Sequence, residues 1–142
     1  VCDGNISGEG FQGWKKHRSI KTLNIQECPI TQEGIQAISE IDGIQNLSLY
    51  CSLTGLNLKP LAKMHLGELA LSGDCTCEQI AVLGESTSID SLHIQLSVID
   101  ESVDEMLVKL KGIKNIKIDV FGRLSEEDRL RLDGIHPGLD ID

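Results

Sequence analysis

Residues 44–49 read Ile44-Gln45-Asn46-Leu47-Ser48-Leu49, and the last three of these residues decide the fold. In an extended strand Leu47 and Leu49 point to one side while Ser48 points to the other. The same spacing recurs every 22 to 24 residues, in the apolar pairs Leu23/Ile25, Leu47/Leu49, Leu69/Leu71, Leu92/Ile94, Ile116/Ile118 and Leu139/Ile141. This recurrence predicts six short strands, each with one buried side.

Two further features keep this period. An apolar residue stands three positions before most pairs, as Ile44 does before Leu47, which completes an L-x-x-L-x-L pattern, and His136 takes that place in the last copy. A second motif, I-[ST]-x-x-G followed by an apolar residue, occurs 24 residues apart at 6–11 and 30–35. Over nearly the whole chain these motifs resemble the leucine-rich repeat family, including the short repeats of many bacterial members.

The resemblance implies an α/β leucine-rich repeat solenoid of about six repeats. Its parallel sheet would form the concave face, with short helices or helical turns on the convex face. We expect one domain over 1–142, with a partial N-terminal repeat at 1–19, central repeats at 20–124 and a charged C-terminal cap at 125–142. Val1 aligns with Ile25 inside a repeat, so we expect the natural chain to begin upstream, unless Phe11 and Trp14 form a cap.

The segments between the strands show helical spacing of apolar residues, for example Ile35, Ile38 and Ile41, and Val103, Met106, Leu107 and Leu110. Capping-box patterns predict helix starts at Thr76 with Gln79, at Ser102 with Glu105, and at Ser125 with Asp128. Pro60 suits a first helical position.

Five cysteines cannot all pair within one chain. The resemblance places Cys28, and less regularly Cys51, where the family has a buried free thiol, so we expect reduced cysteines. Reduced cysteines favour the cytoplasm, and secretion stays open if a signal peptide lies upstream. The later repeats lack this cysteine or asparagine, which predicts irregular turns after the third strand. Cys75 and Cys77 lack zinc-like spacing, so we predict no metal and no cofactor.

The composition of the chain argues against two classes of partner, nucleic acids and membranes. A net charge of −9 and a pI near 4.8 disfavour nucleic-acid binding, which needs clustered lysine and arginine. The one basic cluster, Lys15-Lys16-His17-Arg18 with Lys21, fits a solvated helix end or loop, and the alternative is a site for phosphate or for an acidic protein surface. No apolar run is long enough for a membrane span, so we expect no membrane insertion.

Catalytic motifs are not evident. The four histidines occur singly, and no G-x-S-x-G, H-E-x-x-H or phosphate-loop pattern is present. We therefore predict that the protein is not an enzyme. The remote alternative is a hydrolase that uses His93 with Asp119, or the Cys75/Cys77 pair.

The outward side of the strands remains as the candidate site. We predict a protein-interaction module, part of a larger protein, that binds a protein or peptide there, with Tyr50 as the main anchor. The predicted contacts are Asn24, Gln26, Ser48, Tyr50, Ser72, His93, Gln95, Lys117 and Asp119. The alternative is a structural spacer or cap whose sheet binds nothing. We expect a monomer, or weak self-association through the open N-terminal edge of the sheet.

Overall fold

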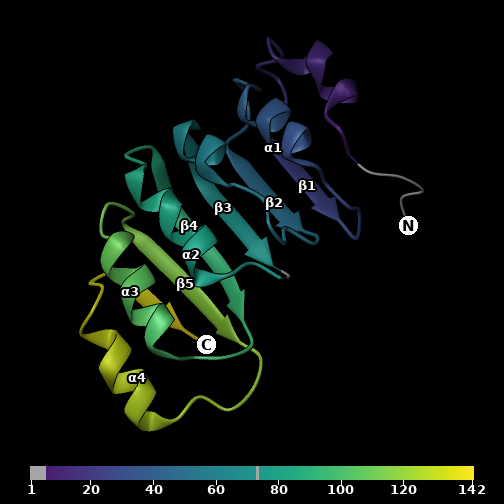
Figure 1. The fold of residues 1–142 in the computed structure, drawn as a ribbon. Coiled ribbons are helices and arrows are strands. Elements are labelled where there is room, and N and C mark those ends of the chain that lie inside the picture. Colours follow the sequence, from purple (N-terminus) through teal and green to yellow (C-terminus); the bar gives the residue numbers. More distant parts are fainter. Residues whose placement is uncertain (1–5, 73) are drawn as a thin grey trace.

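The computed structural model describes residues 6–72 and 74–142 and has an α/β fold (Figure 1). Six strands form one parallel sheet in which the spatial order follows the chain order. The strands are β1 (Thr22–Gln26), β2 (Asn46–Tyr50), β3 (Leu66–Ser72), β4 (Ile89–Leu96), β5 (Asn115–Val120) and β6 (Leu139–Ile141). The predicted parallel sheet is thus confirmed.

The register of the sheet matches the sequence period. Leu23 pairs with Leu47, which pairs with Leu69, and the series continues through Leu92, Ile116 and Leu139. These aligned residues are 22 to 24 positions apart. Register in a half-buried sheet is set by the apolar pattern, because a slip of one residue would expose every leucine. The spacing in the sequence therefore specifies the pairing.

Short helical segments connect the strands and cover one side of the sheet (Figure 1). They are η1 (Glu9–Trp14), α1 (Gln32–Ser39), η2 (Lys59–Lys63), α2 (Cys77–Ala81), η3 (Val82–Glu85), α3 (Glu101–Lys109) and α4 (Glu126–Asp133). Of these, η1, η2 and η3 are 3-10 helices. In the part of the chain that the structure describes, no helix has the length and apolar character to cross a membrane.

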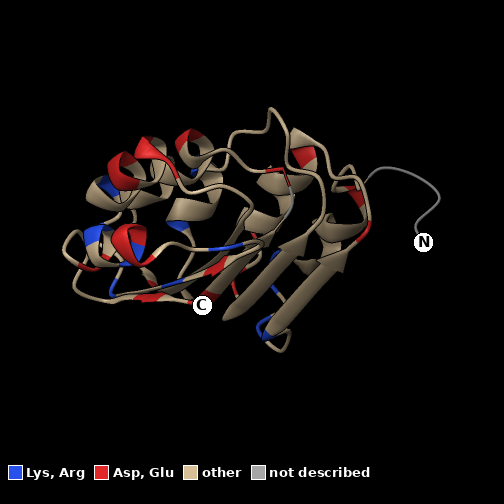
Figure 2. Ribbon diagram, turned by 90° about the horizontal axis from the view of Figure 1, so that it is seen from below, with Lys and Arg blue, Asp and Glu red and all other residues tan. Residues whose placement is uncertain are grey.

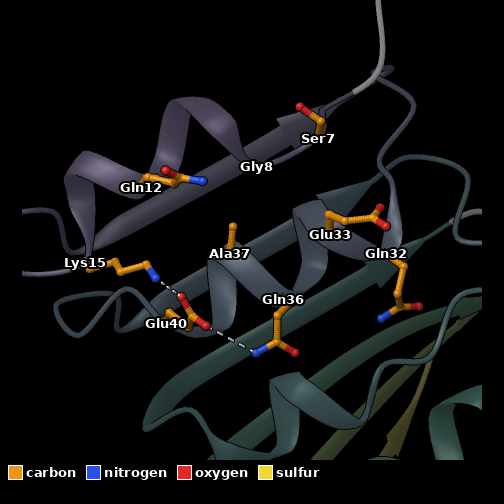
Figure 3. A pocket seen from close by; sticks show the side chains of 9 residues that line it. All are labelled: Ser7, Gly8, Gln12, Lys15, Gln32, Glu33, Gln36, Ala37 and Glu40. Atoms are coloured by element: carbon orange, nitrogen blue, oxygen red, sulfur yellow. Dashed lines mark hydrogen bonds and ion pairs between the residues drawn. The ribbon is translucent and has the colours of Figure 1, made fainter.

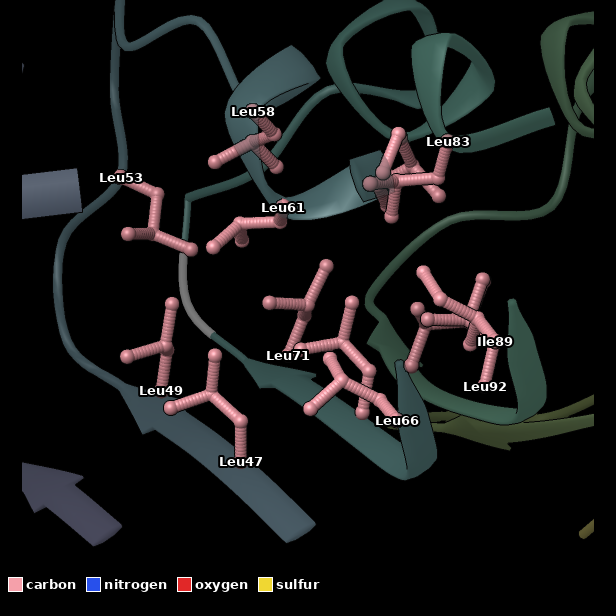
Figure 4. Packing of buried hydrophobic residues seen from close by; sticks show 14 of the residues in the cluster. Leu47, Leu49, Leu53, Leu58, Leu61, Leu66, Leu71, Leu83, Ile89 and Leu92 are labelled. Atoms are coloured by element: carbon pink, nitrogen blue, oxygen red, sulfur yellow. The ribbon is translucent and has the colours of Figure 1, made fainter. Parts of the chain in front are cut away.

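The core fills the space between the sheet and these helical segments (Figure 4). Leu47 and Leu49 of β2 are fully buried, as are Leu58 and Leu61 at η2. Full burial of one such side chain stabilises the fold by about 1.5–3 kcal/mol. Aliphatic residues supply nearly all of this core, as their positions in the sequence predict.

Two of the three predicted capping residues, Thr76 and Ser125, are the N-caps of helices. Thr76 begins α2 with both reciprocal bonds of a capping box to Gln79, and the Ser125 side chain accepts a bond from the Asp128 N–H at α4. The prediction for Ser102 is wrong. The N-cap of α3 is Asp100, whose carboxylate accepts the Ser102 N–H at 2.9 Å. Aspartate caps as well as serine does, so α3 begins earlier. Pro60 stands at the second residue of η2.

The repeated motif at 6–11 and 30–35 brings its two copies together. Ile6 forms a parallel bridge with Ile30, and the Ile6 carbonyl accepts the Thr31 N–H at 3.0 Å. Gly34 explains the glycine of the motif, because a Cβ there would lie 2.3 Å from the Ile6 carbonyl oxygen. We call each strand with the helical segment that follows it a layer. The backbone at Ile6 approaches the backbone at Gly34 in the next layer so closely that no side chain fits at this position.

One expectation about the cysteines is wrong. Cys28 is buried as predicted, but it is disulfide-bonded rather than a free thiol. Cys51, Cys75 and Cys77 are free, and Cys2 lies outside the described residues. Spacing along the sequence places a cysteine on the buried side of a turn, but it does not reveal whether a second sulfur lies within bonding distance.

His136 occupies an apolar position of the repeat and is only 2% exposed. Its Nδ1 accepts the Gly138 N–H at 3.1 Å, so its Nε2 carries the proton and donates to the Leu110 carbonyl at 3.2 Å. Both ring nitrogens are therefore satisfied, as a buried polar side chain requires. This histidine joins neighbouring layers and is a structural residue.

Candidate functional site

The side of the sheet opposite the helices is the candidate site, and we call it the open face. Two rows of outward side chains cross it, each aligned by the strand register. The first row is Asn24, Ser48, Ala70, His93, Lys117 and Asp140. The second row includes Gln26, Tyr50 and Ser72 on one half of the sheet and Gln95 and Asp119 on the other. All predicted contact residues therefore lie on this face.

The centre of the open face has a small, covered residue. Ala70 of β3 is only 2% exposed although its place in the register puts it on this face. Its register neighbours Ser48 and His93 are partly buried. Tyr50 is also partly buried, on the strand next to Ala70. The half-buried ring of Tyr50 therefore combines apolar area with a polar hydroxyl group on this face.

A chain of polar contacts joins β4, β5 and Asp142. His93 Nε2 lies 2.6 Å from Asp119 Oδ2, and Lys117 Nζ lies 3.7 Å from Asp119 Oδ1. Lys117 Nζ also lies 3.0 Å from Asp142 Oδ2. Figure 2 shows that acidic and basic segments both lie on the ribbon near the C-terminus. These contacts link the four side chains across the sheet.

This network shifts two pKa values. The hydrogen bond from His93 is the main reason why the pKa of Asp119 lies below its usual value of 3.8, with Lys117 adding to the effect. The hydrogen bond to Asp142 raises the pKa of Lys117 above 10.5, and the Asp119 charge adds to that shift. Both groups are therefore charged at neutral pH, and each charge has a partner beside it.

The open face also contains a hollow that the sequence reasoning missed. Its volume is about 340 Å³, and it lies toward the N-terminal ends of the strands. Besides His93 and Lys117, its lining includes Glu68, Ser91, Asn115, Gly138 and Asp140. Glu68, Ser91 and Asn115 form a third register-aligned row, two residues before the first row. Extending the period-2 alternation backwards from each apolar pair would have found this row, because β3 and β4 are longer than the pattern itself.

A second hollow, of about 370 Å³, lies on the helical side between η1 and α1 (Figure 3). Lys15 reaches into it and forms an ion pair with Glu40, whose carboxylate also accepts a bond from Gln36 at 3.5 Å. The bond from Lys15 is the main cause of the lowered pKa of Glu40. Since these charges neutralise each other, this hollow offers a ligand less than the open face does.

The structure brings together one of the two catalytic sets considered above. His93 and Asp119 do form a pair, but among the described residues His93 has no hydrogen bond to a hydroxyl or thiol that could act as a nucleophile. Burial raises the pKa of Cys75 to about 12, so its thiol stays protonated at neutral pH. Within residues 6–72 and 74–142 no three His, Cys, Asp or Glu side chains gather as metal ligands would.

Comparison with known proteins adds no identification, since neither a protein-family model nor a curated protein sequence matches the chain.

Proposed function

We propose that the protein is an interaction module of the leucine-rich repeat type that binds a protein or peptide partner on its open face. The observation that carries the proposal is the contrast between the two sides of the sheet. Helical segments cover one side of the sheet, and none of the described helices covers the other (Figure 1). On the side without helices, the strand register aligns three rows of small, polar and charged side chains. The repeated sequence motifs support the assignment of repeat type.

The dimensions of the face suit a macromolecular partner. Six strands about 4.8 Å apart span roughly 25 Å, which is enough for about 800 Å² of contact on one partner. Tyr50 offers a rigid anchor, and its neighbours Ser48, Ser72 and Asn24 are short and polar. Polar surroundings around an aromatic anchor are typical of protein-binding surfaces.

The test compares two double variants with equal charge changes. Ser48→Glu with Tyr50→Glu places two negative charges on the open face, while Gln12→Glu with Val108→Glu places two on the helical side, where Gln12 and Val108 are exposed. Each variant is first checked for unchanged circular dichroism and melting temperature. Partner capture from source-cell extract is then quantified by mass spectrometry.

We expect a partner that is lost from the open-face variant and retained by the helical-side variant. Loss from the helical-side variant alone would contradict the proposal and move the site to the other surface. Capture of nothing by the native chain would favour the spacer alternative, in which the sheet only holds neighbouring parts in position.

A further inference from the structure

The charged side chains of the open face gather around the hollow, and their contacts decide which charge the hollow presents to a ligand. Lys117 and His93 both line the hollow, but their polar ends are held by Asp119 and Asp142. Asp119 lies two residues further along β5 than Lys117, so these contacts draw the ammonium group of Lys117 and the ring of His93 away from the hollow toward the C-terminal ends of the strands. The positive charge of Lys117 is therefore already balanced outside the hollow.

Two carboxylates that line the hollow lack an oppositely charged partner of this kind. Glu68 of β3 and Asp140 of β6 are both exposed, and neither has an ion pair or a side-chain hydrogen bond among the described residues. Asp140 does add weakly to the raised pKa of Lys117, although Asp142 is the stronger partner of that ammonium group. At the adjacent edge Lys114 is 3.5 Å from Asp90, so it does not serve Glu68 or Asp140. Within the part of the chain that the structure describes, the hollow is thus lined by two exposed carboxylates that have no ion-pair partner, while the one ammonium group beside it is paired with Asp119 and Asp142.

The geometry of the sheet separates these two carboxylates. Three strand spacings lie between β3 and β6, which is roughly 14 Å, and the two residues are offset by two positions along the strands. One guanidinium group cannot reach both. An extended peptide rises about 3.4 Å per residue, so side chains four positions apart on one side of it are about 14 Å apart, and the length of an arginine side chain covers the offset along the strands.

The floor between the carboxylates is small and polar. Ser91 and Asn115 lie side by side there, with Asn115 Nδ2 3.4 Å from Ser91 Oγ. Their hydroxyl and amide oxygens can accept further N–H groups. A planar guanidinium with five donors uses such a mixed set of acceptors better than a compact ammonium does.

From this charge complementarity we propose that the hollow receives an extended segment of the partner bearing two arginine side chains four residues apart, one for Glu68 and one for Asp140. The inference rests on the proposed function, because it names the chemistry of the partner of the same face. In this proposal the hollow with Glu68 and Asp140 selects the partner by its charge. Tyr50 on β2 then serves as an anchor for many kinds of partner.

The test selects displayed random linear peptides on the immobilised native chain and sequences the bound pool. We expect enrichment of arginine at a four-residue spacing. The double variant Glu68→Gln with Asp140→Asn should bind a synthetic peptide from this pool roughly tenfold more weakly, with a smaller salt dependence. The matched control is Glu78→Gln with Glu105→Gln, which removes two exposed carboxylates from α2 and α3 and should bind like the native chain.

Peptide variants complete the test. Replacing either arginine of the selected peptide by glutamine should weaken binding to the native chain but not to the Glu68/Asp140 variant. Selection of peptides without arginine, selection of none, or equal binding by both double variants would overturn the inference. None of these results decides the proposed function, which depends on the Ser48 and Tyr50 variant and the captured partner.

Discussion

The Nε2 atom of His93 lies 2.6 Å from Oδ2 of Asp119, although the two residues are 26 positions apart in the chain. Register explains this contact. His93 pairs directly with Lys117, and Asp119 is the next residue on the same side of β5, so the bond runs diagonally across adjacent strands. A small change in register would separate the pair and return His93 to solvent.

The first prediction concerns the dependence of stability on acid. Because the pKa of Asp119 is lowered in the folded chain, its stabilising effect is complete above its unfolded value and is lost as pH falls through the folded value. We expect Asp119→Asn to lower the free energy of unfolding by up to about 1 kcal/mol near neutral pH. Urea unfolding from neutral to acidic pH measures this, and a difference from the native chain that persists below both pKa values would contradict it.

A second prediction concerns close packing between layers. A Cβ at Gly138 would lie 1.8 Å from the Lys114 carbonyl oxygen, a backbone atom that cannot yield without moving β5. We expect Gly138→Ala to destabilise the chain by about 1–3 kcal/mol in thermal unfolding. Gly13→Ala is the matched control, because nothing among the described residues lies within 4 Å of a Cβ there. Equal melting temperatures for both variants would show that β6 shifts freely.

Gln79 is the basis of a third prediction. Its Nε2 donates to the Leu53 and Leu56 carbonyls at 2.7 and 2.9 Å, while its Oε1 accepts the Thr76 N–H at 2.9 Å. Gln79→Glu would keep the cap but place a carboxylate against two carbonyl oxygens, at a cost of about 1–3 kcal/mol. The exposed Gln45→Glu makes the same charge change without losing side-chain bonds. Chemical denaturation of the two variants should separate them clearly.

The fourth prediction concerns thiol reactivity. Since burial raises the pKa of Cys75 to about 12, very little thiolate is present at pH 8. We expect iodoacetamide to modify Cys75 at least about a hundredfold more slowly in the folded chain than in guanidinium chloride. Peptide mapping by mass spectrometry gives both rates, and equal rates would indicate an accessible, ionised thiol.

The strands were predictable because a period-2 pattern repeated at 22 to 24 residues leaves one register that buries every apolar pair. His136 was placed correctly by its phase, although its two hydrogen bonds depend on backbone atoms that no pattern specifies. The orientation of Tyr50 and Asn24 followed from the same alternation.

Other features depend on contacts that spacing does not encode. The α3 cap went to Asp100 because two competent capping residues stand close together in the sequence. The hollow was missed because its carboxylates, Glu68 and Asp140, come from strands that are not neighbours. Recognising it requires knowing that Lys117 is already held by Asp142, which only the folded arrangement shows.

The register has one consequence for how the chain reaches its fold. Contacts between neighbouring layers join residues about one repeat apart, whether through strand pairing, through Gln79 to Leu53 or through His136 to Leu110. Closing each such contact orders a loop of nearly constant length and costs nearly the same chain entropy. We therefore expect that folding can begin between any two adjacent strands and their helical segments and spread in both directions.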